Sequence, residues 1–352
     1  GFARKDFDKR FSYGIFFLVL LAMLVLFFGI FFYAGSHTGE VVLTGSEKSC
    51  GDGTFYDSCS LNKPYFCNQG MLEERASVCG CPEGMGKKGE FCSYKEFTDA
   101  VPAEFPYFLN GERKELQMWL YDGVEEYVSQ LPRAIRYSND EVPLRADFKL
   151  RKINDEIQRQ AILPLVIKIE NLAPNSKVDQ ARIAISLVQN IDYGEPEDYI
   201  EFEDKKVSLS NFPYQTLYSN KGSCEGKSEL LVLLLREIGY GTALFYYPVE
   251  NHEAVGIKCP KENSLLNSGY CFVESTSPSI ITDNGGEYLG AGKLVFSPEL
   301  VLISDGISLP RGLIEYTDAK NLNKLRSKSK LNIFMQGRLL RLLEKYGLDY
   351  SF

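Results

Sequence analysis

A run of twenty residues without a charge, IFFLVLLAMLVLFFGIFFYA at positions 15–34, constrains the chain more than any other feature of the sequence. As an α-helix with a rise of about 1.5 Å per residue, the run is about 30 Å long, which matches the hydrocarbon core of a bilayer. A cleavable signal peptide is the alternative, but its apolar region is usually about 7 to 15 residues long and ends in an A-x-A-like site. Tyr33-Ala34-Gly35 does not supply such a site. The sequence therefore predicts a membrane-spanning helix over residues 15–35.

The distribution of basic residues predicts the orientation of this helix. Arg4, Lys5, Lys9 and Arg10 precede the span, and the next Lys or Arg after it is Lys48. Positive charge accumulates on the cytoplasmic side of membrane helices. We therefore expect residues 1–14 to be a cytoplasmic tip and the rest to be extracellular, which makes the protein a single-pass protein of the cell membrane.

The overall composition is that of a folded acidic protein. Hydrophobic residues make up 44% of the chain and charged residues 24%, with a formal net charge of -8. The hydrophobic content excludes a wholly disordered chain. The charge argues against binding of nucleic acid, because tracking phosphates requires a surplus of Lys and Arg.

A cysteine-rich segment, residues 36–95, follows the predicted anchor. It has no long apolar run with which to build a core. Outside the membrane, its cysteines are expected to form three disulfides among themselves, in one of 15 connectivities that the sequence does not distinguish. A zinc site is the alternative, although paired C-x-x-C motifs and a nearby histidine are missing. The string CGDGTFYDSCSLNKPYFCNQG resembles a short module found beside the anchors of archaeal surface proteins, which implies a stalk or spacer. The six cysteines are Cys50, Cys59, Cys67, Cys79, Cys81 and Cys92.

The remainder of the chain predicts an α+β fold. Residues 96–176 show apolar residues three and four apart and are expected to be a helical lead-in. Strands are expected only later, in TALFYYPV, EAVGIKC and YCFVES, so that an antiparallel sheet follows the helices. A further helix is expected to begin at Ser176 or Asp179.

A candidate nucleophile lies where the helices give way to this sheet. In KGSCEGKSELLVLLLREIGYG, Ser223 is expected to cap a helix that ends at Gly239 or Gly241. Cys224 is then at the helix N-terminus, where the dipole favours a thiolate and backbone N–H groups offer oxyanion donors. Downstream, His252 and Glu274 supply a base for the thiol and a carboxylate to orient the imidazole.

These motifs resemble the transglutaminase-like superfamily of papain-type cysteine enzymes. PYQTLYSNKGSCEGKSELLVLLLREIGY, NHEAVGI and FVESTSP look most like its archaeal members. The resemblance is strong over residues 177–279 and loose over 110–310, and it implies a transglutaminase-like domain at 177–310. Carried over by position, it implies that Cys224 is the nucleophile, His252 the general base and Glu274 the third member.

The chain departs from the family pattern at two positions. Glu274 stands where many members have Asp, and Gly226 stands where an acid is frequent. A longer carboxylate still reaches the imidazole, so the first departure is mild. Gln215, nine residues before Cys224, is a candidate for binding the oxyanion, with a solvated side chain as the alternative.

The remaining cysteines support the same nucleophile. Cys259 and Cys271 flank one connection and are expected to form a disulfide, which leaves Cys224 unpaired. Strand parity places both of them on the face opposite His252 and Glu274. A register with His252 directly opposite Glu274 would leave the two cysteines diagonal, so the bridge needs the strands to shift or to end early.

The C-terminal segment, residues 311–352, has nine basic and four acidic residues. FMQGRLLRLLEKYGL is expected to be an amphipathic helix. It either packs its leucine face on the domain and solvates its charges, or contacts a membrane surface or a protein.

The function predicted from these features is thiol acyl transfer on amide substrates. A cysteine peptidase or amidase acting on a peptide or protein at the cell surface is favoured, using Cys224, His252 and Glu274 through a thioester. A cross-linking transglutaminase and a non-catalytic surface scaffold that retains the fold are the alternatives. The chemistry needs no cofactor, no metal site is predicted, and the bilayer is expected to hold residues 15–35.

Overall fold

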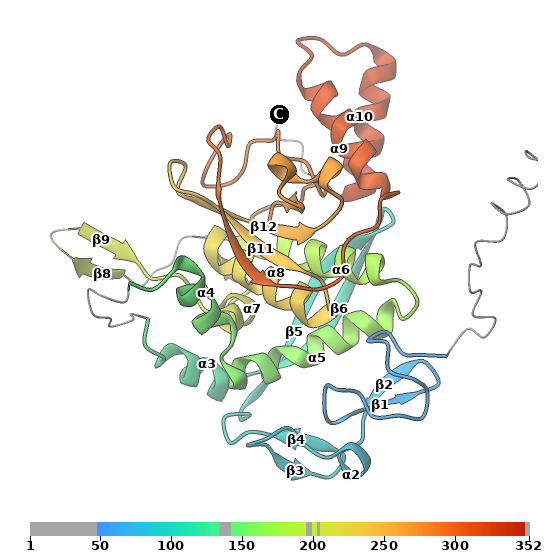
Figure 1. Cartoon of the computed structure of the whole chain (residues 1–352), viewed down its shortest axis with the longest axis vertical. Helices are drawn as coiled ribbons and strands as arrows, with labels where there is room; N and C mark the ends of the chain where they lie inside the picture. Colours follow the sequence, from blue (N-terminus) through green and yellow to red (C-terminus); the bar gives the residue numbers. More distant parts are fainter. Residues whose placement is uncertain (1–47, 134–141, 195–198, 203–204, 349–352) are drawn as a thin grey trace, which may run out of the picture. The chain divides into compact units, whose positions relative to one another are not determined.

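The computed structural model describes residues 48–133, 142–194, 199–202 and 205–348, which belong to one compact unit that starts at Lys48 (Figure 1). The predicted cytoplasmic tip and membrane helix, residues 1–35, lie outside the described residues. Among the helices that are described, none has both the length and the apolar character needed to cross a membrane. The described chain is α+β, with small antiparallel sheets and a disulfide-rich region at its N-terminal end.

The cysteine-rich region consists of two short hairpins and one turn of helix. The first hairpin joins β1 (Tyr65–Asn68) to β2 (Met71–Glu74), helix α2 (Ala76–Cys79) follows, and the second hairpin joins β3 (Gly86–Lys88) to β4 (Phe91–Ser93). Three disulfides hold these pieces together, which confirms the prediction of disulfide bonds and selects one of the 15 connectivities. They are Cys50–Cys67, Cys59–Cys79 and Cys81–Cys92.

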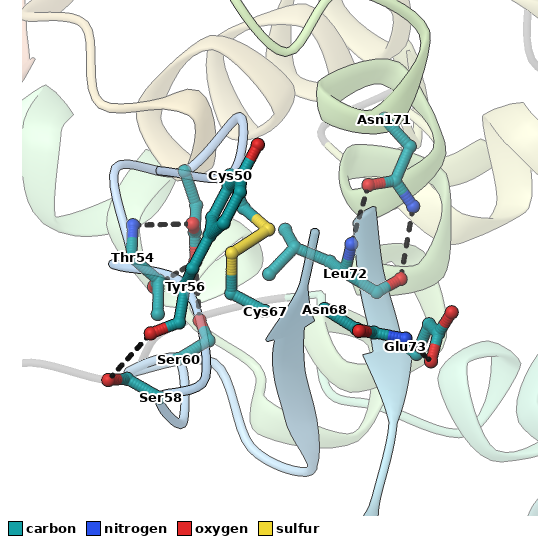
Figure 2. The surroundings of a disulfide bond; sticks show 11 residues. Cys50, Thr54, Tyr56, Ser58, Ser60, Cys67, Asn68, Leu72, Glu73 and Asn171 are labelled. Carbon is teal, nitrogen blue, oxygen red and sulfur yellow. Dashed lines mark hydrogen bonds between the residues drawn. A yellow bond between two sulfur atoms is a disulfide. The ribbon is translucent and has the colours of Figure 1, made fainter. Parts of the chain in front are cut away.

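This region packs directly on the helices that follow it. Asn171 on helix α5 (Glu156–Leu172) accepts a hydrogen bond from the Leu72 backbone N–H at 2.8 Å and donates one to the Leu72 carbonyl at 3.1 Å (Figure 2). Gly51 lies against the backbone of Glu170 so closely that a Cβ atom would stand 2.3 Å from its carbonyl oxygen. The Cys50–Cys67 bridge and Leu72 therefore belong to the same buried cluster as α5.

The segment between residues 96 and 131 differs from the helical lead-in that we expected. It forms a long antiparallel hairpin of β5 (Ala100–Leu109) and β6 (Glu112–Tyr121), and only then a helix, α3 (Asp122–Ser129). Along β6 buried and exposed side chains alternate, as in a strand with one face on the core. The sequence does not show this alternation, because Trp119 is exposed although it is apolar like its buried neighbours Met118 and Leu120.

Helix α3 is followed by α4 (Arg145–Ile153), α5 and α6 (Lys177–Gln189). Asp155 caps α5 by accepting from the Gln158 N–H, and Ser176 caps α6 by accepting from the Asp179 N–H, so the predicted start of α6 is confirmed. The apolar side of α6 packs against β5 and the following core helix. Short pairs β7 (Asp192–Tyr193) with β10 (Lys221–Gly222) and β8 (Tyr199–Phe202) with β9 (Lys205–Ser208) follow, together with α7 (Pro213–Tyr218).

The central helix α8 (Cys224–Ile238) and a four-stranded sheet complete the core. Ser223 caps α8 by accepting from the Gly226 N–H, and the helix ends at Gly239 in the left-handed conformation, with φ 110°. The sheet is antiparallel in the order β13-β12-β11-β14, so the predicted sheet is confirmed, with one more strand than was expected. Its strands are β11 (Thr242–Tyr247), β12 (His252–Lys258), β13 (Tyr270–Val273) and β14 (Glu299–Ser304).

The two faces of this sheet have different neighbours. Leu244, Val255 and Val273 point to the side of α8 and join the main core, whereas Phe245, Ala254 and Phe272 form a separate cluster with Tyr288. Val255 pairs with Val273, so the register is shifted by two residues from the one that would set His252 opposite Glu274. With this shift, Cys259 and Cys271 have Cα atoms 5.7 Å apart and form a disulfide.

The chain ends in a helical hairpin of α9 (Ile314–Arg326) and α10 (Ile333–Tyr346), which pack on each other (Figure 1). The leucine face of α10 is buried against leucines of α9 and against Ile280, in a cluster of its own. The expected C-terminal amphipathic helix is therefore present.

Candidate active site

Cys224 is the first residue of α8 and the only cysteine of the described residues that is not in a disulfide. Its side chain is partly exposed. The capping oxygen of Ser223 takes the N–H of Gly226 and so fixes the start of the helix one residue before the thiol. Cys224 therefore lies at the end of α8 where the backbone N–H groups have no partner within the helix and where the positive end of the helix dipole is located.

His252 and Glu274 come together at one end of the sheet. His252 begins β12 and Glu274 directly follows β13, so both lie where two neighbouring strands meet. The His252 Nε2 atom is 3.0 Å from the Glu274 Oε2 atom, and the two side chains are 1% and 0% exposed. Because Nε2 is engaged by the carboxylate, Nδ1 is the ring nitrogen that remains for the thiol of Cys224.

The carboxylate of Glu274 is held by its own chain. Its Oε1 atom accepts hydrogen bonds from the backbone N–H of Ser275 at 2.9 Å and from the N–H and hydroxyl of Thr276, each at 2.8 Å. The backbone carbonyl of Glu274 accepts a bond from the Gln189 amide at 2.8 Å. With one oxygen fixed by three donors, the other is aimed at the imidazole.

The surroundings of His252 favour the imidazolium form. Burial of the ring acts to lower its pKa, but hydrogen bonds with the Cys224 and Glu274 side chains and the negative charge of both raise the pKa to about 10. The rings of Tyr288, stacked at a centroid distance of 6.2 Å, and of Tyr247, at 6.4 Å, shield the imidazole from water. His252 is therefore expected to carry a positive charge at neutral pH.

A buried lysine connects the nucleophile's helix to the histidine's strand. Lys149 on α4 has its Nζ atom 2.6 Å from Glu225, 3.0 Å from Glu229 and 2.9 Å from Glu253. Glu225 directly follows Cys224, and Glu253 directly follows His252. Lys152 also contacts Glu229, at 2.6 Å, so two ammonium groups face three carboxylates. We call these five residues the Lys149 cluster.

A second buried lysine connects α8 to the loop of the acid. Lys227, one turn after Cys224, is 0% exposed and donates to the carbonyl oxygens of Thr276 at 2.9 Å, Gln189 at 3.3 Å and Ile191. Burial lowers the pKa of Lys227 to about 8, against the opposing attraction of Glu274 and Asp192. Lys227 thus holds the segment that carries Glu274 against the helix that carries Cys224.

Gln215, the oxyanion candidate of the sequence, makes other contacts. Its Oε1 atom accepts from Arg133 at 2.8 Å and from the Phe212 N–H at 3.1 Å, and its amide nitrogen donates to Glu125 at 3.0 Å. These bonds fix Gln215 at the start of α7. None of the contacts described for it involves Cys224.

A cleft of about 860 Å³ lies between residues 277–293 and the C-terminal hairpin, and Cys224, His252 and Glu274 are not among its lining residues. Tyr288, which stacks on His252, is part of its wall. Ser277, which follows buried Thr276 in the chain, also lines the cleft.

The sequence alone identified the three residues that meet here, Cys224, His252 and Glu274. It did not identify Lys149, Lys227 or Gln189, which tie the elements of the site together. The one sequence signal that indicated a special role for Lys227 is its position directly after a glycine in the first turn of an apolar helix. For Lys149 and Gln189 no local signal exists, because each lies on an ordinary amphipathic helix far from the motif.

Comparisons with known proteins add no further assignment. No family model matches the chain, and searches of curated proteins and of solved structures also return no match.

Proposed function

We propose that this protein is a transglutaminase-like cysteine enzyme that hydrolyses amide bonds in peptides or proteins by way of a thioester on Cys224. The observation that carries the proposal is the buried pair of His252 and Glu274, 3.0 Å apart, in which the imidazole pKa is raised to about 10 beside the thiol of Cys224 at a helix N-terminus. A nucleophile, a base and an orienting acid are the parts that such chemistry needs.

The reaction follows from these positions. The Cys224 thiolate attacks the carbonyl carbon of the substrate, and the N–H groups at the head of α8 stabilise the oxyanion that forms. The C–N bond then breaks as the His252 imidazolium gives its proton to the leaving amine, which leaves a thioester on the sulfur. A water molecule next gives a proton to neutral His252 and attacks the thioester carbonyl; the C–S bond then breaks, which releases the carboxylic acid and restores the Cys224 thiolate beside the His252 imidazolium.

The neighbouring residues have supporting roles in this proposal. Glu274 accepts a hydrogen bond from the Nε2–H of His252, which leaves Nδ1 to face the sulfur, and its charge stabilises the imidazolium. The Lys149 cluster and Lys227 hold Cys224, His252 and Glu274 at a fixed separation.

The proposed location is the outer face of the cell membrane. Four disulfides in the described residues fit an oxidising compartment, where such bonds persist. The apolar run at 15–34 would supply the anchor. Transfer of the acyl group to a lysine amine would proceed through the same thioester, so the test includes an amine acceptor.

The first experiment measures the rate at which iodoacetamide alkylates Cys224 in the full chain between pH 5 and pH 9, with the site mapped by mass spectrometry. We expect half-maximal reactivity well below the free-thiol pKa of about 8.5, and its loss in His252→Ala. His37→Ala, which changes the other histidine of the chain, serves as the matched control and should behave as wild type.

The second measurement separates the chemistries. Casein is incubated with the protein and a fluorescent primary amine. Peptide release without amine incorporation supports hydrolysis, and incorporation into casein glutamines supports transamidation instead. An oxidised Cys224, or one that reacts like an ordinary thiol with and without His252, overturns the enzyme and leaves a non-catalytic surface scaffold.

A further inference from the structure

The C-terminal hairpin of α9 and α10 carries an unbalanced positive charge. Between Asp318 and Glu344 the chain contains no acidic residue, although its formal net charge is -8. Arg326 in this stretch is paired with Asp283, at 2.7 Å, and among the described residues the other basic side chains here form no ion pair. These unpaired side chains are Lys320, Lys324, Lys328, Lys330, Arg338 and Arg341.

The same hairpin exposes large apolar side chains at its tip. Ile333 and Phe334, the first two residues of α10, are 77% and 84% exposed, and Leu340, two turns further, is 40% exposed. They lie away from the buried face of α10, whose leucines are used by the contact with α9. The helix therefore has a second apolar surface, which no described part of the chain covers.

Charge and apolar side chains share this surface. Phe334, Arg338 and Arg341 follow one another at intervals of four and three residues, so they line one side of α10. Lys328 and Lys330 are exposed in the turn just before Ile333. We call Lys328, Lys330, Ile333, Phe334, Arg338, Leu340 and Arg341 the hairpin tip.

We propose that the hairpin tip is a docking surface for the headgroup region of an anionic lipid bilayer. Ile333 and Phe334 insert below the headgroups, and the surrounding cations contact lipid phosphates from the ends of their long side chains. The surface combines four cations, in a stretch of chain without an acidic residue from 319 to 343, with a protruding aliphatic and aromatic pair. A nucleic acid would match the cations but not the exposed Ile333, so the bilayer explains both parts of the surface.

The predicted anchor of the chain also favours a bilayer. The sequence predicts a membrane-spanning helix over residues 15–34, so lipid would always be present near this domain at high local concentration. Contact through the tip would then fix how the domain lies on the membrane surface.

The proposal is tested on the full chain in nanodiscs, with a reporter at the tip. Phe334→Trp is introduced together with Trp119→Phe, which removes the only native tryptophan. Quenching of Trp fluorescence by brominated acyl chains is then measured in nanodiscs of phosphatidylcholine mixed with phosphatidylserine and in nanodiscs of phosphatidylcholine alone. We expect strong quenching in the anionic nanodiscs only.

Charge-reversal variants provide the matched comparison. Each basic residue near an anionic surface raises the binding constant for the membrane roughly fivefold. Lys328→Glu with Lys330→Glu should therefore lower this constant more than about 25-fold and abolish the quenching. Lys87→Glu with Lys88→Glu, on the exposed strand β3, changes the same charge elsewhere and should leave the quenching unchanged.

Each other outcome overturns the proposal. Equal quenching in neutral nanodiscs would show that the tip contacts lipid without charge recognition. Quenching that survives the reversal of Lys328 and Lys330 would likewise show that their charge does not recognise the lipid. No quenching in either lipid, together with an emission shift that depends on protein concentration or on added RNA, would assign the tip to a second copy of the chain or to a nucleic acid. Near-UV circular dichroism checks that all variants are folded.

Discussion

The Nζ atom of Lys149 lies 2.9 Å from the Glu253 carboxylate, although 104 residues separate the two in the chain. The same ammonium lies 2.6 Å from Glu225, which is the neighbour of Cys224, whereas Glu253 is the neighbour of His252. One side chain from α4 therefore fixes the backbones of the proposed nucleophile and base relative to each other. Lys149 is a positioning residue in the proposed enzyme, because it contacts neither the sulfur nor the imidazole in the contacts described for it.

Lys149→Met should weaken both the fold and the site. Removing the ammonium leaves three carboxylates facing Lys152 alone, and breaking a buried ion pair on one side costs about 3–5 kcal/mol. In the folded fraction, alkylation of Cys224 at pH 6.5 should fall roughly 100-fold, because small displacements of reacting groups have effects of this size. Urea denaturation and the iodoacetamide rate measure the two effects.

Lys168→Met is the control for this variant, because Lys168 is an exposed lysine on the neighbouring helix α5. Lys168→Met should change neither the free energy of unfolding nor the rate at which iodoacetamide alkylates Cys224. If Lys149→Met loses stability but its folded fraction reacts at the wild-type rate, Lys149 serves the fold alone.

Glu253 should make the stability of the protein fall with rising pH. Burial raises its pKa to about 7, and the neighbouring Glu225 and Glu229 add to this against the attraction of Lys149. The folded protein thus keeps a proton that the unfolded chain loses near pH 4.5, and the stability contributed by this proton is lost as pH rises through about 7.

Glu253→Gln cannot ionise, so its stability relative to wild type should increase between pH 5 and pH 8, by up to roughly 3 kcal/mol. Urea denaturation at four pH values checks this expectation. Glu115→Gln, at an exposed position of β6, should show no such trend. A constant difference between Glu253→Gln and wild type would mean that Glu253 titrates as an ordinary carboxyl group.

Glu274→Gln should raise the pH at which Cys224 becomes reactive. An amide nitrogen facing His252 Nε2 would force that nitrogen to accept, place the ring proton on Nδ1 and remove the negative charge that helps to hold the pKa of His252 near 10. Alkylation at pH 6 should drop roughly 100-fold, and its midpoint should move toward about 8.5. Glu274→Asp keeps the charge, so its pH midpoint of alkylation should lie between those of wild type and Glu274→Gln. An unchanged midpoint in Glu274→Gln would exclude Glu274 from the triad.

Asn171→Ala should loosen the cysteine-rich region. The variant loses two hydrogen bonds to the backbone of Leu72, which are worth about 1 kcal/mol each (Figure 2). Hydrogen exchange at the Leu72 amide should speed up accordingly, by roughly tenfold or more. Asn68→Ala removes the exposed bond between Asn68 and Glu73 in the same hairpin and should leave this exchange rate unchanged. Equal protection in both variants would show that the disulfides alone fix β2.

The sequence predicted the elements of the candidate site where the signals were local. The cap at Ser223, the apolar block behind it and Gly239 define α8 within one residue at each end. The strand parity of Cys259 and Cys271 relative to His252 and Glu274 also agrees with the two faces of the sheet. These features depend only on residues that are close in the chain.

Features that depend on distant residues were not predictable. Lys149 lies in a segment rich in Arg, Lys and Asp that is typical of a solvated helix, and its burial depends on carboxylates that follow about 80 to 100 residues later. The hairpin of β5 and β6 was missed because Leu116 and Leu120 fit a helical spacing as well as an alternating one. The strand β14 pairs with β11 although more than fifty residues separate them, and no local sequence pattern indicates this pairing.

The shared core of the disulfide-bonded region and the helices has a consequence for how such a protein can evolve. Gly51 tolerates no side chain against Glu170, and Leu72 depends on a single amide from α5. A recombination event that transferred the domain without residues 48–95 would uncover part of its apolar interior and leave Asn171 without its partners. The two regions are therefore expected to be inherited together, with glycine kept at residue 51 and asparagine at residue 171 among descendants of the same ancestor.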